Sequence, residues 1–289
     1  MAFDWIHLLA AFGGGLFAAA IGTLPSFVFT GLLVLVGVAV AAAGGGTDVL
    51  TQVAFGPVFG PHIAFGGGAA ATAYAYRRGY VPSGRDISLP LMGLNRPDVL
   101  LVGAAFGSIG YLLELAWRSV GLAAHTDTIA MTVVISAMIA RVLFGRSGLA
   151  SRQFRPDERR NWVRHQERPT QCAVIGLGVG LLSAFMALAL GPERGGDVVG
   201  FGIAATSLVF AQFGLKVPVT HHMALPAAAA ALASGDFLVG SLFGVVGAFA
   251  GEGFSRVFHQ HGDTHVDPPA AGIALTMVLV RMLWPLPIA

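Results

Sequence analysis

Apolar segments of similar length, separated by short polar ones, make up most of this chain. A helix needs about 20 apolar residues to cross a bilayer. Ten stretches approach that length: residues 6–23, 26–43, 53–76, 98–118, 126–145, 172–190, 197–214, 217–234, 236–255 and 268–287. Membrane β-strands would alternate polar and apolar residues over about ten positions, and these stretches do not. The pattern predicts an all-α integral membrane protein with about ten transmembrane helices.

Composition and charge narrow the class further. Of the 289 residues 55% are hydrophobic and 11% charged, which excludes an ordinary soluble domain and intrinsic disorder. The net charge is only +2, and the basic residues lie in short loops, so no nucleic-acid partner is predicted. Placing the N-terminus outside leaves every Lys and Arg except Arg118, Arg194 and Arg281 on or beside the cytoplasmic side. The positive-inside rule then predicts a multi-pass protein of the plasma membrane.

The sequence repeats itself. Residues 101–110 read LVGAAFGSIG and residues 238–247 read LVGSLFGVVG, which agree at six of ten positions. Three further matches follow in the same order: Glu114 and Arg118 with Glu252 and Arg256, His125 with His261, and Asp127-Thr128 with Asp263-Thr264. Collinear matches of this kind indicate an internal duplication.

Each copy holds five predicted spans. The copies are residues 1–145 and 172–289, joined by an Arg-rich segment at 146–171 that we interpret as a cytoplasmic connector. Because five is odd, the second copy must enter the membrane from the opposite side. The predicted architecture is therefore a 5+5 inverted repeat, a symmetry that many secondary transporters share.

Each copy also carries a broken helix. Pro57, Gly60 and Pro61 interrupt the third span around His62, and Pro218 and Pro226 flank His221 and His222 in the eighth. Irregular backbone at membrane depth is tolerated where it lines a cavity, and histidine titrates near neutral pH. We expect His62, His221 and His222 on a substrate or ion pathway, with His62 and His222 related by a pseudo-two-fold axis and flanking one shared cavity.

Carboxylates are the other candidates for that pathway. Asp127 and Asp263 stand before predicted helices, where they could cap the helix or act in gating. Glu114 and Glu252 lie within spans, and each has an arginine four residues later. That spacing favours an ion pair on one helix face, with a gate between the repeats as the alternative. The repeated LVGxxFGxxG motif predicts close helix packing through its glycines.

The segment at 259–267 reads HQHGDTHVD and is a weak candidate for a metal site. Its metal candidates are His259, His261, His265 and Asp267. The spacing fits no fixed zinc signature, and the first repeat keeps only part of the set. No cofactor is predicted.

These observations favour a transporter. The chain has no Walker motif, so a permease driven by alternating access, with protons as a coupling ion, accounts best for the repeat and the broken helices. Few charges face the membrane interior, which favours a small neutral, zwitterionic or singly charged solute. The alternatives are a channel for a small neutral or weakly basic solute and an intramembrane His/Asp metalloenzyme. No enzymatic activity is expected, and a homo-oligomer is compatible with the sequence.

Overall fold

The computed structural model describes residues 3–150 and 168–285, and these residues fold into helices joined by short loops. The bounds of the α-helices are Trp5–Ile21 (α1), Thr23–Ala42 (α2), Ala64–Arg77 (α3), Pro97–Ser119 (α4), Thr128–Phe144 (α5), Pro169–Leu190 (α6), Val199–Ser207 (α7), Val209–Gln212 (α8), His221–Ser234 (α9), Phe237–Phe254 (α10) and Pro268–Leu283 (α11). Two π-helical segments, Val49–Ala54 (η1) and Ser255–His259 (η6), complete the main elements. Helices occupy all ten predicted stretches.

The predicted all-helical class is thus confirmed, and a membrane protein is supported. Four helices are long and apolar enough to cross a membrane: Thr23–Ala42, Pro97–Ser119, Pro169–Leu190 and Phe237–His259. Four more are apolar but shorter: Trp5–Ile21, Thr128–Phe144, Val199–Gln212 and Pro268–Leu283. Most of the predicted connector, residues 151–167, lies outside the described residues.

Glycine contacts hold α1 against α4. A Cβ atom on Gly15 would lie 2.2 Å from the carbonyl oxygen of Gly103, and one on Gly107 would lie 2.2 Å from that of Ala11. Because no other residue permits such an approach, the backbones of the two helices are in direct contact. The predicted packing role of Gly103 and Gly107 is confirmed.

The second half repeats this contact between α6 and α10. A Cβ on Gly180 would lie 2.2 Å from the carbonyl oxygen of Ser241, and one on Gly244 would lie 2.4 Å from that of Gly176. The short helices start at matching places as well. The carbonyl of His62 lies against Gly110 of α4, and the carbonyl of His222 lies against Gly247 of α10. Corresponding helices of the two halves therefore use corresponding glycines.

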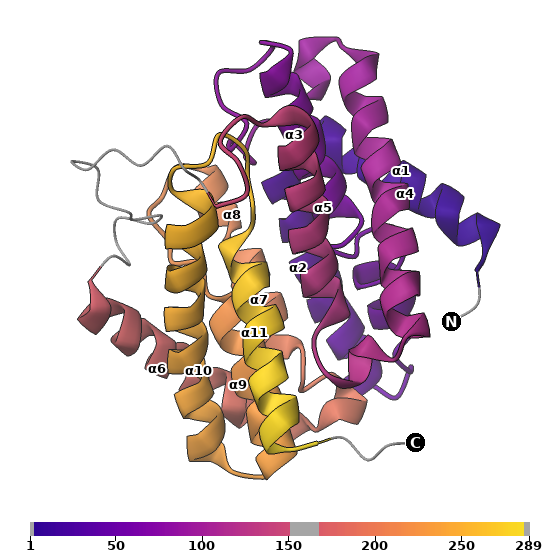
Figure 1. Ribbon diagram of the computed structural model, residues 1–289. Coiled ribbons are helices and arrows are strands. Elements are labelled where there is room, and N and C mark those ends of the chain that lie inside the picture. The colour runs from indigo at the N-terminus through magenta and orange to yellow at the C-terminus, as the bar shows by residue number, and fades with distance from the viewer. Residues whose placement is uncertain (1–2, 151–167, 286–289) are drawn as a thin grey trace.

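The two halves meet mainly through two helix pairs, α2 with α7 and α5 with α11. In Figure 1, α5 and α11 lie side by side at the centre and run in opposite directions. Helices α4 and α1 extend to one side of this pair, and α10 and α6 extend to the other. The largest core cluster joins residues of both halves, among them Phe27, Val34, Phe201 and Ile273.

The third predicted span is interrupted, as expected, whereas the eighth is not broken at Pro226, which lies inside the continuous helix α9. Helix α3 begins only at Ala64, after the π-helical segment η1 and an irregular stretch at residues 55–63. Helix α9 begins at His221, after α7, α8 and a non-helical stretch at 213–220. Both α3 and α9 have 14 residues, or about 21 Å at 1.5 Å per residue. Each is too short to cross a bilayer alone. Residues 60–63, just before α3, are buried, whereas residues 213–216 in the stretch before α9 are exposed.

Candidate functional site

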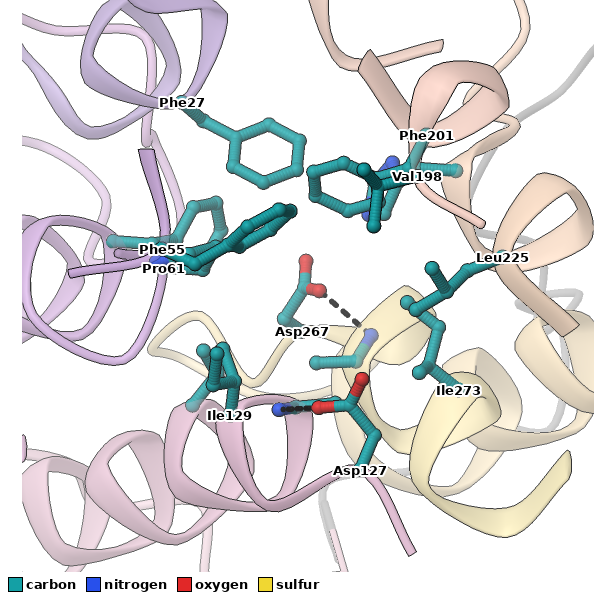
Figure 2. Close-up of a pocket in the computed structure, with 15 residues that line it drawn as sticks. Phe27, Phe55, Pro61, Asp127, Ile129, Val198, Phe201, Leu225, Asp267 and Ile273 are labelled. Atoms are coloured by element: carbon teal, nitrogen blue, oxygen red, sulfur yellow. Dashed lines mark hydrogen bonds between the residues drawn. The ribbon is translucent and has the colours of Figure 1, made fainter. Parts of the chain in front are cut away.

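A cavity of about 160 Å³ lies between the two halves. Its wall is largely apolar, and Figure 2 shows aromatic rings gathered on one side of it. Four phenylalanines line it: Phe27, Phe55, Phe65 and Phe201. Their rings are in contact, with centroids 5.6 Å apart for Phe27 and Phe65 and 5.5 Å apart for Phe55 and Phe201. We call this space the central cavity.

Corresponding positions of the two halves line the central cavity. Three pairs come from α5 and α11, at a constant separation of 267 − 127 = 140 residues; they are Asp127 with Asp267, Ala130 with Ala270, and Val133 with Ile273. Two more come from the starts of α3 and α9, at a separation of 221 − 61 = 160; they are Pro61 with His221 and Phe65 with Leu225. The cavity therefore lies where the two halves face each other.

Asp127 and Asp267 are the carboxylates of this cavity, and both cap helices. The backbone N–H of Ala130 donates to Asp127 over 2.8 Å, and that of Ala270 donates to Asp267 over 2.8 Å. Nε2 of His265 lies 3.1 Å from the other oxygen of Asp267. A helix N-terminus stabilises a carboxylate, so each half directs one anionic group toward the cavity.

The prediction that Asp263 caps a helix, as Asp127 does, is wrong. Asp263 caps no helix; its carboxylate accepts hydrogen bonds from the backbone N–H of Arg146 and from the hydroxyl of Ser147. The cap of α11 is Asp267, which precedes Pro268 and Pro269. Proline is favoured at the first helical position, and this signal could have identified the cap from sequence. His125 then corresponds to His265.

The histidines are distributed differently from the prediction. His221 lines the central cavity and is 5% exposed, and its ring centroid lies 4.8 Å from that of Phe27. His222 is buried against Gly251, and it lines neither this cavity nor the one described next, to which His62 belongs. His62 and His222 do occupy corresponding places, but neither of these two cavities, among the described residues, is lined by both.

A second, more polar cavity of about 310 Å³ adjoins the first. We call it the outer cavity. Polar side chains line much of it: His7, Thr51, Gln52, His62, Tyr111, Glu114 and Arg118. Phe55 and Ile129 line both cavities. These two side chains thus lie between the polar cavity and the aromatic one.

The predicted ion pairs are present. Nε of Arg118 donates to Glu114 over 2.6 Å, and the Arg256 side chain bonds Glu252 over 2.7 Å. Glu114 also accepts a hydrogen bond of 2.7 Å from the hydroxyl of Thr128, the first residue of α5. Glu114 therefore connects α4 to the start of α5 beside the outer cavity, while its role in gating stays a prediction.

Arg141 is a buried cation that sequence reasoning treated only as a marker of topology. It is 1% exposed, near the end of α5. Its guanidinium donates to the hydroxyl and carbonyl oxygens of Thr264 and to the carbonyl of Phe258, all in the second half. Asp263 in turn accepts a hydrogen bond from Ser147, at the start of the connector. We call these contacts the connector-side seal, because they close the end of the α5–α11 pair next to the connector.

The metal hypothesis is not supported. Within residues 3–150 and 168–285, no three His, Cys, Asp or Glu side chains come together as a metal site requires. His265 is instead engaged with Asp267, and its ring lies 4.7 Å from that of His259. His261 is buried in the same loop. This loop joins the seal to the cap of α11.

Comparison with known proteins places the chain in a family. It belongs to the family described as "Family of unknown function (DUF7973)", whose model matches residues 1–156 and again residues 150–288. No curated protein and no solved structure matches the chain.

Proposed function

We propose that this protein is a multi-pass membrane transporter that moves a small solute through the central cavity by alternating access. The observation that carries the proposal is the composition of the cavity wall. Corresponding residues of both halves line it, with Asp127 facing from one side and Asp267 from the other. A site at the interface of two related halves opens to either side when the halves rearrange.

The proposal includes a ten-span inverted repeat with the N-terminus outside. Three observations support it. The same family model matches each half of the chain. The α1–α4 and α6–α10 contacts use corresponding glycines, and α5 and α11 run in opposite directions (Figure 1). An inverted repeat, in which each half contains an odd number of spans, accounts for all three observations.

The structure then corresponds to one state of the transport cycle. The outer cavity adjoins the central one through Phe55 and Ile129, while the connector-side seal closes the other end. With the N-terminus outside, the closed end is the cytoplasmic one. Opening that end would require Arg141 to leave Thr264 and Phe258.

Proton coupling remains part of the proposal. His62 lines the outer cavity and His221 the central one, so both lie along the route that a solute would take. Replacing His62 or His221 with Gln would keep hydrogen-bonding capacity and remove titration. Accumulation driven by a pH gradient in proteoliposomes should then fall while exchange continues. Unchanged accumulation in both variants would exclude coupling through these histidines.

Alternating access can be tested without knowing the solute. In a Cys172→Ser background, Ile273→Cys places a thiol in the central cavity, and Val174→Cys, 72% exposed on α6, is the control for a lipid-facing thiol. A membrane-impermeant thiosulfonate reagent added to either side should modify the first thiol and spare the second. If reagent added to neither side modifies the Ile273→Cys thiol, the proposal is contradicted.

An engineered disulfide distinguishes a carrier from a channel. The hydroxyl of Ser147 donates to Asp263 over 2.8 Å, so the double variant Ser147→Cys/Asp263→Cys should cross-link the seal. In a carrier, cross-linking should stop modification of Ile273→Cys from the connector side and speed it from the other side. A channel would lose the first reaction and show no change in the second.

A further inference from the structure

We propose that the central cavity binds a small organic monocation, a methylated or alkylated ammonium, between its phenylalanine rings and the carboxylates of Asp127 and Asp267. This inference names the solute class of the proposed transporter. Only the movement of this cation across the membrane rests on the proposed transport function. Its binding to the cavity can be measured without transport.

Charge is the first argument. Two carboxylates face a cavity whose remaining wall is almost entirely apolar. Figure 2 shows each of them with one oxygen bonded to its own helix and the other directed elsewhere. Asp267 is further engaged by His265, whereas no imidazole among the described residues bonds Asp127. Anionic groups in a low-dielectric site repel anions and attract cations strongly, and the less engaged Asp127 provides the main site for a single positive charge.

The aromatic wall is the second argument. Phe27 contacts both Phe65 and Phe201, and Phe201 also contacts Phe55, so the four rings form one continuous surface. The face of an aromatic ring carries partial negative charge and attracts a cation within about 6 Å of its centroid. Cages of this kind are suited to quaternary ammonium groups, which have apolar methyl surfaces and a diffuse charge.

The lining argues against other solutes. Among the described residues around the cavity, none has a hydroxyl or an amide side chain. A metal cation such as Ca²⁺ requires about six oxygen ligands, and two helix-capping carboxylates do not supply them. A polar neutral solute would leave most of its hydrogen bonds unmade. An alkylated ammonium needs charge compensation and apolar contact, and the wall provides both.

Size and one further polar atom define the ligand. An apolar cavity of about 150 Å³ holds a molecule the size of benzene, and the volume here is about 160 Å³. This fits an ammonium with a few small substituents and excludes long chains. His221, 5% exposed, lines the same space, and its Nδ1 has no hydrogen-bond partner among the described residues. An N–H or O–H group of the ligand can form the missing hydrogen bond with this nitrogen.

The test compares two molecules that differ only in charge. Choline and 3,3-dimethylbutan-1-ol have the same shape, with N⁺ in one and carbon in the other. Calorimetric titration of the full-length purified protein in detergent should show choline binding at least tenfold more tightly. Equal affinities, or tighter binding of the alcohol, would overturn the proposal.

Variants locate the binding to this cavity. Asp127→Asn keeps a capping oxygen and removes the charge, and should weaken choline binding at least tenfold. Phe201→Leu keeps an apolar wall without the ring and should weaken it severalfold. The control is Asp236→Asn, because Asp236 caps α10 by accepting from the N–H groups of Leu238 and Val239 and is exposed, away from the cavity. Thermal unfolding of each variant verifies that it is folded.

Each outcome has a definite meaning. Choline binding that Asp127→Asn leaves unchanged is binding elsewhere and overturns the inference. If choline binds in the cavity but Ile273→Cys is reached from one side only, the binding site stands and alternating access fails. If the thiol is reached from both sides and choline shows no advantage over the alcohol, the transporter stands and the solute class is wrong.

Discussion

The two ends of the α5–α11 pair differ in what joins the halves of the molecule. At the connector end, Arg141 is buried and bonds two residues of the second half, and Asp263 bonds Ser147 at the start of the connector. Toward the start of α5, the described cross-link between these helices is the single hydrogen bond of 2.7 Å from Thr126 to the carbonyl of Ala274. The outer cavity lies at this second end.

Related positions therefore have different environments. Arg281 of α11 lies 281 − 141 = 140 residues after Arg141, the same separation that relates the other α5 and α11 pairs. Arg141 is buried, whereas Arg281 is only partly buried near the opposite end. The two ends of the α5–α11 pair are therefore held by contacts that differ in number and burial, although the helices themselves are related.

The largest expected loss of stability is at the connector end of the α5–α11 pair. Arg141→Met removes charge-assisted hydrogen bonds and leaves buried carbonyl groups without a donor, so it should lower the free energy of unfolding by about 3 kcal/mol. It should also speed thiol modification of Ile273→Cys from the connector side. The control is Arg77→Met, exposed in the last turn of α3. Equal effects of the two variants in SDS titration would remove the distinction between the ends.

Glu114 gives the next largest effect. Glu114→Gln weakens the bonds from Arg118 and Thr128, and the cost should be about 2 kcal/mol, because Glu114 is 5% exposed and has several donors. Glu252→Gln should cost about 1 kcal/mol, since Oε2 of Glu252 has no partner among the described residues. Unfolding measured in detergent checks the order, and a larger loss for Glu252→Gln would reverse our interpretation.

Thr126→Val tests the end near the start of α5 directly. The replacement keeps the shape and removes the hydrogen bond to Ala274, so stability should fall by about 1 kcal/mol. The conformational consequence is the sharper readout. Losing this bond should leave the connector-side seal intact, and reactivity of Ile273→Cys from the connector side should not change. An increase there would mean that the two ends are coupled.

The smallest effect is expected from Arg85. Its guanidinium donates to the carbonyl of Gln260 over 2.8 Å, beside the seal, but the side chain is exposed. Arg85→Ala should change stability by less than about 0.5 kcal/mol. A loss comparable with that of Arg141→Met would show that the surface contact, and not the buried one, holds this end together.

The sequence alone was sufficient to predict the helices and the side-chain contacts within one helix. The segment expected at 98–118 is α4 at Pro97–Ser119, and the one at 6–23 is α1 at Trp5–Ile21. Apolar runs with polar boundaries determine such limits to within a few residues. The Glu114–Arg118 pair was equally accessible, since residues four apart share a helix face.

The central cavity could not be predicted from the sequence in this way. Phe27, Phe55, Phe65 and Phe201 come from four separate segments, and an aromatic residue in an apolar span looks the same whether it faces lipid or a cavity. The cap of α11 was missed because His261-Asp263-Thr264 resembles His125-Asp127-Thr128 more closely than His265 and Asp267 do. Arg141 was missed because a cation near a span end is usually taken as topogenic.

The two capping carboxylates link the cavity to the local stability of the protein. The N–H groups of Ala130 and Ala270 depend on the same carboxylates that would face a ligand. A cation that draws electron density from these oxygens weakens the bonds that close the first turns of α5 and α11. Amide hydrogen–deuterium exchange at those turns would then report occupancy, and the helix starts nearest the cavity would be the first part of the molecule to respond to its contents.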